Sequence, residues 1–157
     1  MTELLKEKES YMEKMFFQLR ITSRYLTLMG NKAFEKLNFP ISFEEYVILD
    51  KIAVNEGICH RDLARMLLRD RSNIGKIVSG LEKKGLLKVT PDIRNNRAIK
   101  KMKINEKGIK LCNAMYVKLE PYMETLNKNI NREEFEAVSS IMAKCKNVID
   151  NIIETQI

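Results

Sequence analysis

The apolar residues of this chain change their spacing at Gly85, and this change limits the folds that the sequence can adopt. Over residues 71–84, four apolar side chains recur at steps of three and four, as on one face of a helix. These residues are Ile74, Ile77, Val78 and Leu81. Residues 86–90 and 98–104 have the pattern of two short strands, and the polar segment 91–97 between them is typical of a turn. The sequence therefore predicts a helix followed by a β-hairpin.

A shorter helix is predicted directly before this one. It covers residues 59–68 and places Leu63, Met66 and Leu67 toward the core. Asp70 is well placed to cap the helix that follows, because its carboxylate can accept hydrogen bonds from the free N–H groups of a first helical turn. Two such helices followed by a hairpin form a winged helix-turn-helix.

Longer helices are predicted on both sides of this module. One covers residues 4–36, and another covers residues 42–54 and opens with a capping box. Asn105 and Asn131 are placed to cap two further helices. The predicted fold is a single domain, residues 1–157, mainly α with a small β-hairpin wing. Its order is two helices, a short strand, two helices, a strand, the wing, a strand and two final helices.

The terminal helices carry apolar stripes that are long and continuous, and such stripes usually need a partner. We therefore expect a homodimer in which residues 1–36 and 106–157 interlock as dimerisation helices. Residues 42–104 then form the winged helix-turn-helix, which is the DNA-binding region of this prediction.

The positive charge of the chain is concentrated in its middle. Of the net charge of +7, residues 56–103 contribute +8, from 13 Lys or Arg and 5 Asp or Glu, and the remaining residues contribute −1. A segregated basic block is typical of a protein that binds a polyanion such as double-stranded DNA. A winged-helix module that contacts other proteins instead of DNA is the alternative, and the local charge argues against it.

The outward face of the helix over 71–84 carries small, polar or basic side chains that allow close approach to the major groove. The candidate recognition residues are Arg71, Ser72, Asn73, Lys76 and Ser79, and the candidate wing residues are Asp92, Arg94 and Arg97. Arg94 lies near the tip of the hairpin, where an arginine can enter a minor groove. Asp92 is expected to brace the loop, either by accepting hydrogen bonds from backbone N–H groups or by pairing with Arg94. Gly75 and Gly80 each cost about 1 kcal/mol relative to alanine inside a helix, which is understandable if the backbone approaches a surface there.

Several classes of protein are disfavoured by what the sequence lacks. No apolar run approaches the length of a membrane span, and residues 1–9 lack the apolar core of a signal peptide, so we expect a cytoplasmic protein without membrane association. Three widely spaced cysteines and a single histidine make a metal site hard to build, and we expect no metal and no cofactor. The chain shows no nucleophile–base pair or phosphate-binding loop, which argues against an enzyme.

Five short motifs in a fixed order resemble the MarR family of winged helix-turn-helix transcriptional regulators. They are LA at 63–64, DRSNI at 70–74, LEKKGL at 81–86, DIRNNRA at 92–98 and NEKG at 105–108. The resemblance extends over the whole chain, and its central 50 or so residues carry most of the specificity. It implies a homodimer in which each winged helix contacts one half of a pseudo-palindromic operator, with repression as the commoner outcome.

The resemblance also implies how such a regulator is released from DNA. A small aromatic or phenolic effector would bind between the dimerisation helices and the winged helix. The candidate cleft residues are Phe16, Leu19, Arg20, Tyr46, Met115 and Tyr116, although a stripe of this kind is more often core. Some relatives sense oxidants through a cysteine in the first helix; this chain has none there, and Cys59 is the remaining candidate because a helix N-terminus favours the thiolate.

This sequence departs from the family pattern at four places. The common Thr-Arg pair in the middle of the recognition helix is Gly75-Lys76, which lacks the planar arginine fork. The usual wing aspartate is Asn95, the usual Thr or Ser before the preceding helix is Cys59, and the glycine often found in the turn is Leu68.

Overall fold

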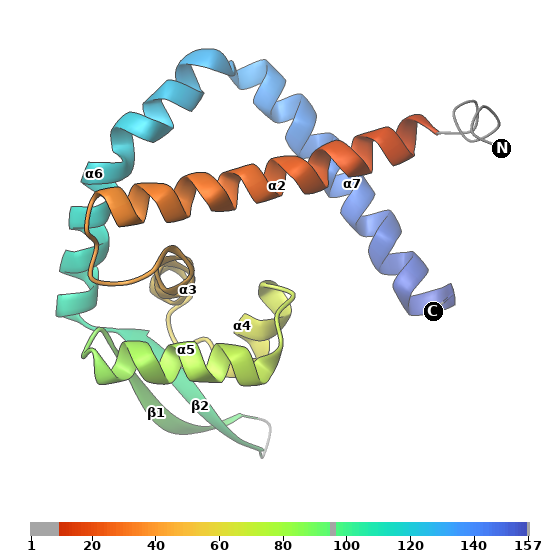
Figure 1. Ribbon diagram of the computed structural model, residues 1–157. Coiled ribbons are helices and arrows are strands. Elements are labelled where there is room, and N and C mark those ends of the chain that lie inside the picture. The colour runs from red at the N-terminus through yellow and green to blue at the C-terminus, as the bar shows by residue number, and fades with distance from the viewer. Residues whose placement is uncertain (1–9, 95–96, 157) are drawn as a thin grey trace, which may run out of the picture. The chain divides into compact units, whose positions relative to one another are not determined.

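The computed structural model describes residues 10–94 and 97–156, which form helices and one β-hairpin (Figure 1). The elements are α2 (Tyr11–Lys36), α3 (Phe43–Val54), α4 (His60–Met66), α5 (Arg71–Lys83), β1 (Leu87–Arg94), β2 (Arg97–Ile104), α6 (Glu106–Asn129) and α7 (Arg132–Gln156). The chain divides into two compact units, Met1–Val117 and Lys118–Ile157, with the boundary inside α6. Within the described residues, no helix has the length and apolar character that a membrane span requires. The mainly helical fold with a hairpin wing is thus confirmed.

The long first helix begins later than the sequence predicts. It starts at Tyr11, because Ser10 caps it: the Ser10 hydroxyl accepts a hydrogen bond from the Met12 N–H at 3.1 Å, and Glu13 accepts one from the Ser10 N–H at 2.7 Å. The segment 4–9, which was expected to be helical, lies outside the described residues. The helix ends at Lys36, as predicted.

The core of the first unit gathers around one face of α5. Fully buried side chains come from α3, α4, α5, the hairpin and the first half of α6. They are Leu49, Ile52, Leu63, Ile74, Val78, Leu81, Met102 and Met115. The prediction that Met66 points inward is wrong: 48% of this residue is exposed, and the small Ala64 is buried in its place.

The turn between α4 and α5 holds a leucine in an unusual conformation. Leu68 has a φ of +48°, in the left-handed region, and 87% of it is exposed. This conformation costs a side-chain-bearing residue about 1–2 kcal/mol relative to the right-handed region. This cost explains why the family pattern has a glycine at the position that Leu68 occupies here.

The hairpin is longer than the sequence predicts. Its strands pair antiparallel from Leu87↔Ile104 to Arg94↔Arg97, so most of the expected turn at 91–97 is strand. Pro91 cannot donate a ladder hydrogen bond, but a two-stranded sheet has only edge strands, where proline is tolerated. The short strand expected before α4 is present as a single bridge between Cys59 and Lys101.

The second unit consists of the end of α6 and all of α7. Asn131 caps α7 as predicted: its side chain accepts a hydrogen bond from the Glu134 N–H at 2.9 Å, and Glu134 accepts one from the Asn131 N–H at 2.9 Å. Large apolar residues of α7 recur at three- and four-residue steps and are exposed in the single chain. They are Phe135, Val138, Ile141, Met142, Val148, Ile149, Ile152 and Ile153.

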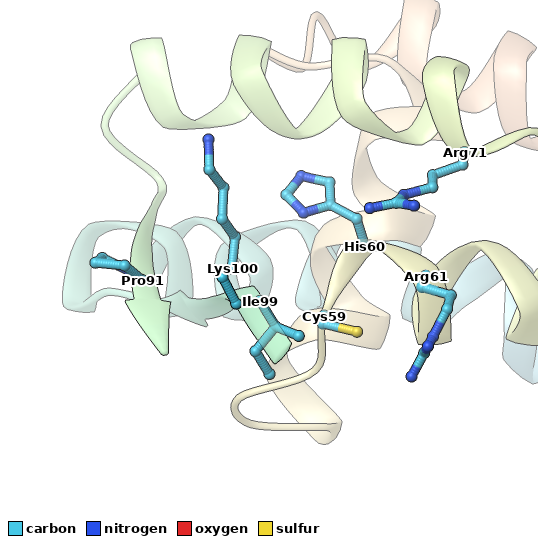
Figure 2. A pocket seen from close by; sticks show the side chains of 8 residues that line it. Cys59, His60, Arg61, Arg71, Pro91, Ile99 and Lys100 are labelled. Carbon is cyan, nitrogen blue, oxygen red and sulfur yellow. The ribbon is translucent and has the colours of Figure 1, made fainter. Parts of the chain in front are cut away.

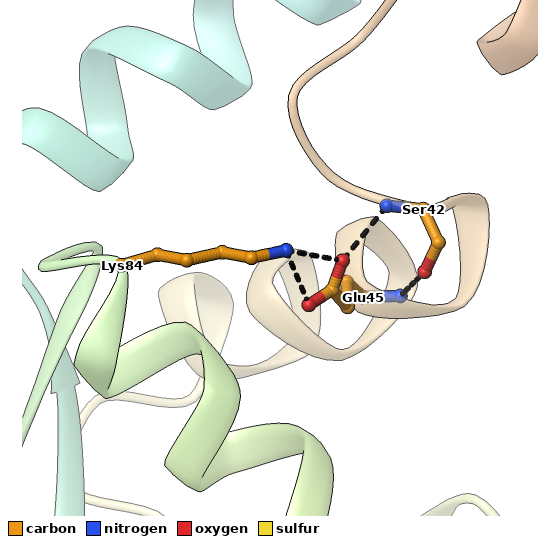
Figure 3. A network of polar contacts seen from close by, with 3 residues as sticks. All are labelled: Ser42, Glu45 and Lys84. Carbon is orange, nitrogen blue, oxygen red and sulfur yellow. Dashed lines mark hydrogen bonds and ion pairs between the residues drawn. The ribbon is translucent and has the colours of Figure 1, made fainter.

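A polar network joins the start of α3 to the end of α5 (Figure 3). Ser42 and Glu45 form the predicted capping box, with N–O distances of 2.8 and 3.1 Å. The Lys84 ammonium donates to both carboxylate oxygens of Glu45, at 2.7 and 2.8 Å. Burial by itself raises the pKa of Glu45, but the contacts with Lys84 and Ser42 outweigh it and leave the pKa below its usual value. The network therefore needs an ionised carboxylate.

We expect the variant Glu45→Gln to be less stable than the wild type at pH 7 by up to about 1 kcal/mol, the range of ion pairs accessible to solvent. A carboxyl with a lowered pKa in the folded state stabilises the fold above its unfolded-state value, near 4.5, and the stabilisation disappears as the pH falls through the folded-state pKa. Urea unfolding at pH 7 and pH 3 measures this. A difference that is the same at both pH values would show that the charge of Glu45 contributes nothing.

Candidate nucleic-acid interface

Helix α5 is fixed at both ends and along one side. At its start, the Asp70 carboxylate accepts hydrogen bonds from the backbone N–H groups of Ser72 and Asn73, at 2.7 and 3.2 Å. The hydrogen bonds from Ser72 and Asn73 lower the pKa of Asp70, so this cap stays ionised. Near the end of the helix, the Val89 N–H of the hairpin donates to Glu82 at 3.0 Å. The helix and the hairpin therefore keep a defined relative position.

The face of α5 opposite the core carries the predicted recognition residues. Arg71, Ser72, Lys76 and Ser79 are exposed, and Asn73 is half-buried. The Ser72 hydroxyl donates to Asp70 at 2.6 Å, so it turns its acceptor side to the solvent. This face has no large apolar side chain, and its small residues leave room for close contact with another molecule.

The wing arginine is held by a residue that the sequence did not point to. Arg94 forms an ion pair with Asp62 of α4, at 3.1 Å, instead of being braced by Asp92. Asp92 pairs with Lys101 on the neighbouring strand at 2.7 Å, and this contact and the Ile93 N–H lower its pKa. Of the two expected contacts of Asp92, the hydrogen bond with a backbone N–H of the loop is present, at Ile93, and the acid that pairs with Arg94 is Asp62.

Two parts of the predicted wing remain outside the description. The backbone of Arg97 begins β2, but its side chain is not described. The hairpin tip at 95–96 also lies outside the described residues. It includes Asn95, which replaces the usual wing aspartate.

A cleft of about 520 Å³ lies between the start of α4, the start of α5 and the hairpin (Figure 2). The Arg71 side chain extends toward His60, and the ring of His60 points toward Lys100, which reaches up from β2. Burial and the nearby Lys100 and Arg71 hold the pKa of His60 below its ordinary value, against the opposing effect of Glu82. Pro91 and Ile99 add apolar surface. Apart from the local charge, no sequence pattern predicts this cleft, because the three elements that form it meet only in the fold.

The six residues expected to line an effector cleft lie on α2, α3 and α6, and Tyr46 and Tyr116 are close enough to interact electrostatically. Neither the cleft beside His60 and Arg71 nor the one beside Phe34 and Phe43 is lined by any of the six. Met115 belongs to the core, and Tyr46 packs against Phe34 with ring centroids 5.4 Å apart. Phe16, Leu19 and Arg20 lie in the first half of α2, which extends away from α3 (Figure 1).

Cys59 is placed at the N-terminal end of α4, as predicted, but it is 5% exposed and donates a hydrogen bond to Asp62 at 3.2 Å. Burial raises the pKa of Cys112 to about 11. Among the described residues, no group of three His, Cys, Asp or Glu side chains is placed to hold a metal ion.

Comparison with known families identifies the central region. Residues 41–99 match the model of the MarR family. An uncharacterized HTH-type transcriptional regulator, YybA, of Bacillus subtilis strain 168 is 27% identical over 133 residues, which cover 85% of this chain and 87% of that protein.

Solved structures share the fold at low sequence identity. A MarR/EmrR family transcriptional regulator from Acinetobacter sp. ADP1 superposes with a TM-score of 0.77 at 17% identity, over 90% of this chain and 99% of that one. MepR of S. aureus, in a complex with DNA, gives a TM-score of 0.69 at 22% identity, over 85% and 96% of the two chains.

We expect Cys59 and Cys112 to resist alkylation by iodoacetamide in the native protein at pH 8. Cys59 is buried, and with a pKa of about 11 only about one Cys112 thiol in a thousand is ionised at this pH. Mass spectrometry of each cysteine peptide, with and without urea, measures the protection. Rapid labelling of Cys59 in the folded protein would contradict this prediction and support the hypothesis that this residue senses oxidants.

Proposed function

Because the chain belongs to the MarR family of winged helix-turn-helix transcriptional regulators, we propose that it is a repressor that binds a pseudo-palindromic operator as a homodimer and is released by a small molecule. The observation that carries this proposal is the outward face of α5, which is polar, basic and free of bulky side chains, beside a basic hairpin. MarR-family proteins are regulators rather than enzymes, so the enzyme interpretation is dropped.

In the proposed complex, α5 enters the major groove and the hairpin contacts the adjacent minor groove. Asn73 can pair with adenine, and Lys76 can reach a guanine or a phosphate. Arg71 and Ser79 extend the contact along α5, and Arg97 extends it along the hairpin. Arg94 must exchange its ion pair with Asp62 for the narrow, negative minor groove. Since that pair is accessible to solvent, the exchange costs at most about 1 kcal/mol.

We propose that a second copy of the chain covers the exposed apolar stripes of the terminal helices. In α7 the stripe runs from Phe135 to Ile153 at helical spacing, and α2 carries further exposed aromatic residues such as Phe16, Phe17 and Tyr25. A patch this extensive on a single chain is typical of an interface. A two-fold dimer places two copies of α5 side by side, which matches the symmetry of a palindromic site.

The effector is proposed to be a small aromatic or phenolic molecule. The residues predicted for its cleft lie on α2, α3 and α6, and in the proposed dimer the partner copy would complete this site. The cleft at His60, Arg71 and Lys100 offers another place, and its cationic side chains and apolar surface suit the ionised form of such a molecule. A molecule bound there would compete directly with DNA.

Operator binding is tested with duplexes selected from a random pool, by fluorescence anisotropy over a series of salt concentrations. We expect affinity to fall steeply with salt, because phosphate contacts release counterions. Lys76→Ala and Arg94→Ala should each weaken binding about tenfold, which is the size of one good groove contact. Lys32→Ala, an exposed cation on α2, serves as the matched control and should bind like the wild type.

Two outcomes would contradict the proposal. If all three variants lost the same small amount of affinity, the basic charge would act without a defined interface. If the wild type bound no duplex even at low salt, the module would be one that contacts proteins instead of DNA.

A further inference from the structure

We infer that Gly75 determines which operator sequence this protein accepts, because its missing side chain lets the backbone of α5 approach one base-pair edge of the major groove directly. The inference rests on the proposed function and adds a specificity-determining position to it. The position presents no side chain of its own to the DNA.

Nothing in the described part of the chain requires a glycine at this position. A Cβ built on Gly75 meets no described atom within 4 Å. By contrast, a Cβ on Gly108 would lie 2.1 Å from the Leu86 carbonyl oxygen, and one on Gly30 would lie 2.6 Å from the Phe43 ring. Those two glycines are explained by packing, and Gly75 is not.

Backbone conformation does not explain it either. Gly75 lies inside α5 with an ordinary helical φ, unlike Gly57 and Gly85, whose φ values of +80° and +69° favour glycine. In a helix interior, glycine is among the least favourable residues. The position therefore weakens α5 without a visible benefit inside the molecule.

The surroundings of Gly75 point to an external partner. Its neighbours on the helix surface, three and four residues away, include Arg71, Ser72 and Ser79. All three are exposed; Arg71 and Ser79 can each donate a hydrogen bond to DNA, and the Ser72 hydroxyl, which donates to Asp70, can accept one. Gly75 is thus a small residue surrounded by side chains that can form hydrogen bonds. When such a patch lies against the groove, the base pair opposite the glycine comes closest to the helix, and a thymine methyl fits where a Cβ would otherwise lie.

Gly80 of the same helix provides the matched control. A Cβ at Gly80 would lie 3.8 Å from the Glu45 Oε1, an ordinary contact, so alanine fits there too. This contact shows that Gly80 faces α3 and not the groove. Alanine at either position should raise the thermal midpoint by about 2–4 °C, because helix propensity improves in the same way.

The test measures Gly75→Ala, Gly80→Ala and the wild type by thermal unfolding and by anisotropy, with the selected operator and with a random duplex of equal length. We expect Gly75→Ala to bind the operator at least tenfold more weakly, with unchanged affinity for the random duplex. Gly80→Ala should bind both duplexes like the wild type. Repeating the selection with Gly75→Ala should change the preferred bases at one position in each half-site.

The inference is overturned if Gly75→Ala binds the operator as tightly as the wild type, or if both duplexes lose affinity equally. These results differ from a failure of the proposed function, in which the wild type itself selects no operator. Because Gly75→Ala is expected to melt at a higher temperature, weaker binding by this variant cannot be attributed to unfolding.

Discussion

Helix α5 can bury only one of its faces, and the packing of that face decides what the other face presents to the solvent. Ile74, Val78 and Leu81 are almost completely buried against α3, α4 and the hairpin. Burial of each stabilises the fold by about 1.5–3 kcal/mol, which is more than an accessible ion pair contributes. The rotation of α5 about its own axis is therefore set by apolar packing, and Ser72, Lys76 and Ser79 face outward as a consequence.

Apolar packing does not determine the position of α5 along its axis or the placement of the hairpin beside it. Polar contacts determine both. Asp70 fixes the start of the helix, Lys84 ties its end to Glu45, and Glu82 holds the backbone of Val89. Each of these contacts is individually weak. Together they hold the recognition helix and the wing in one relative position. Contact with two neighbouring grooves of a duplex would require such a defined position.

Much of this arrangement could be predicted from the sequence, because it depends on local patterns. The helical spacing around Ile74, the cap at Asp70 and the capping box at Ser42 each depend on residues only a few positions apart, and the structure confirms them. The errors occur where distant segments meet. The ion pair of Arg94 with Asp62 joins residues 32 positions apart, and the cleft at His60 and Lys100 needs three elements at once. The early end predicted for the first strand came from Pro91 and Asp92, whose turn preference is overridden by pairing with the second strand.

In the proposed dimer, two copies of α5 and of the hairpin contact one duplex in a symmetric way. Hydroxyl-radical footprinting of the protein on a duplex selected from a random pool tests this most directly. We expect two identical sets of protected sugars, related by a two-fold axis and with half-site centres about one helical turn, or 10 base pairs, apart. A single unpaired footprint, or protection without a fixed position on the duplex, would contradict it.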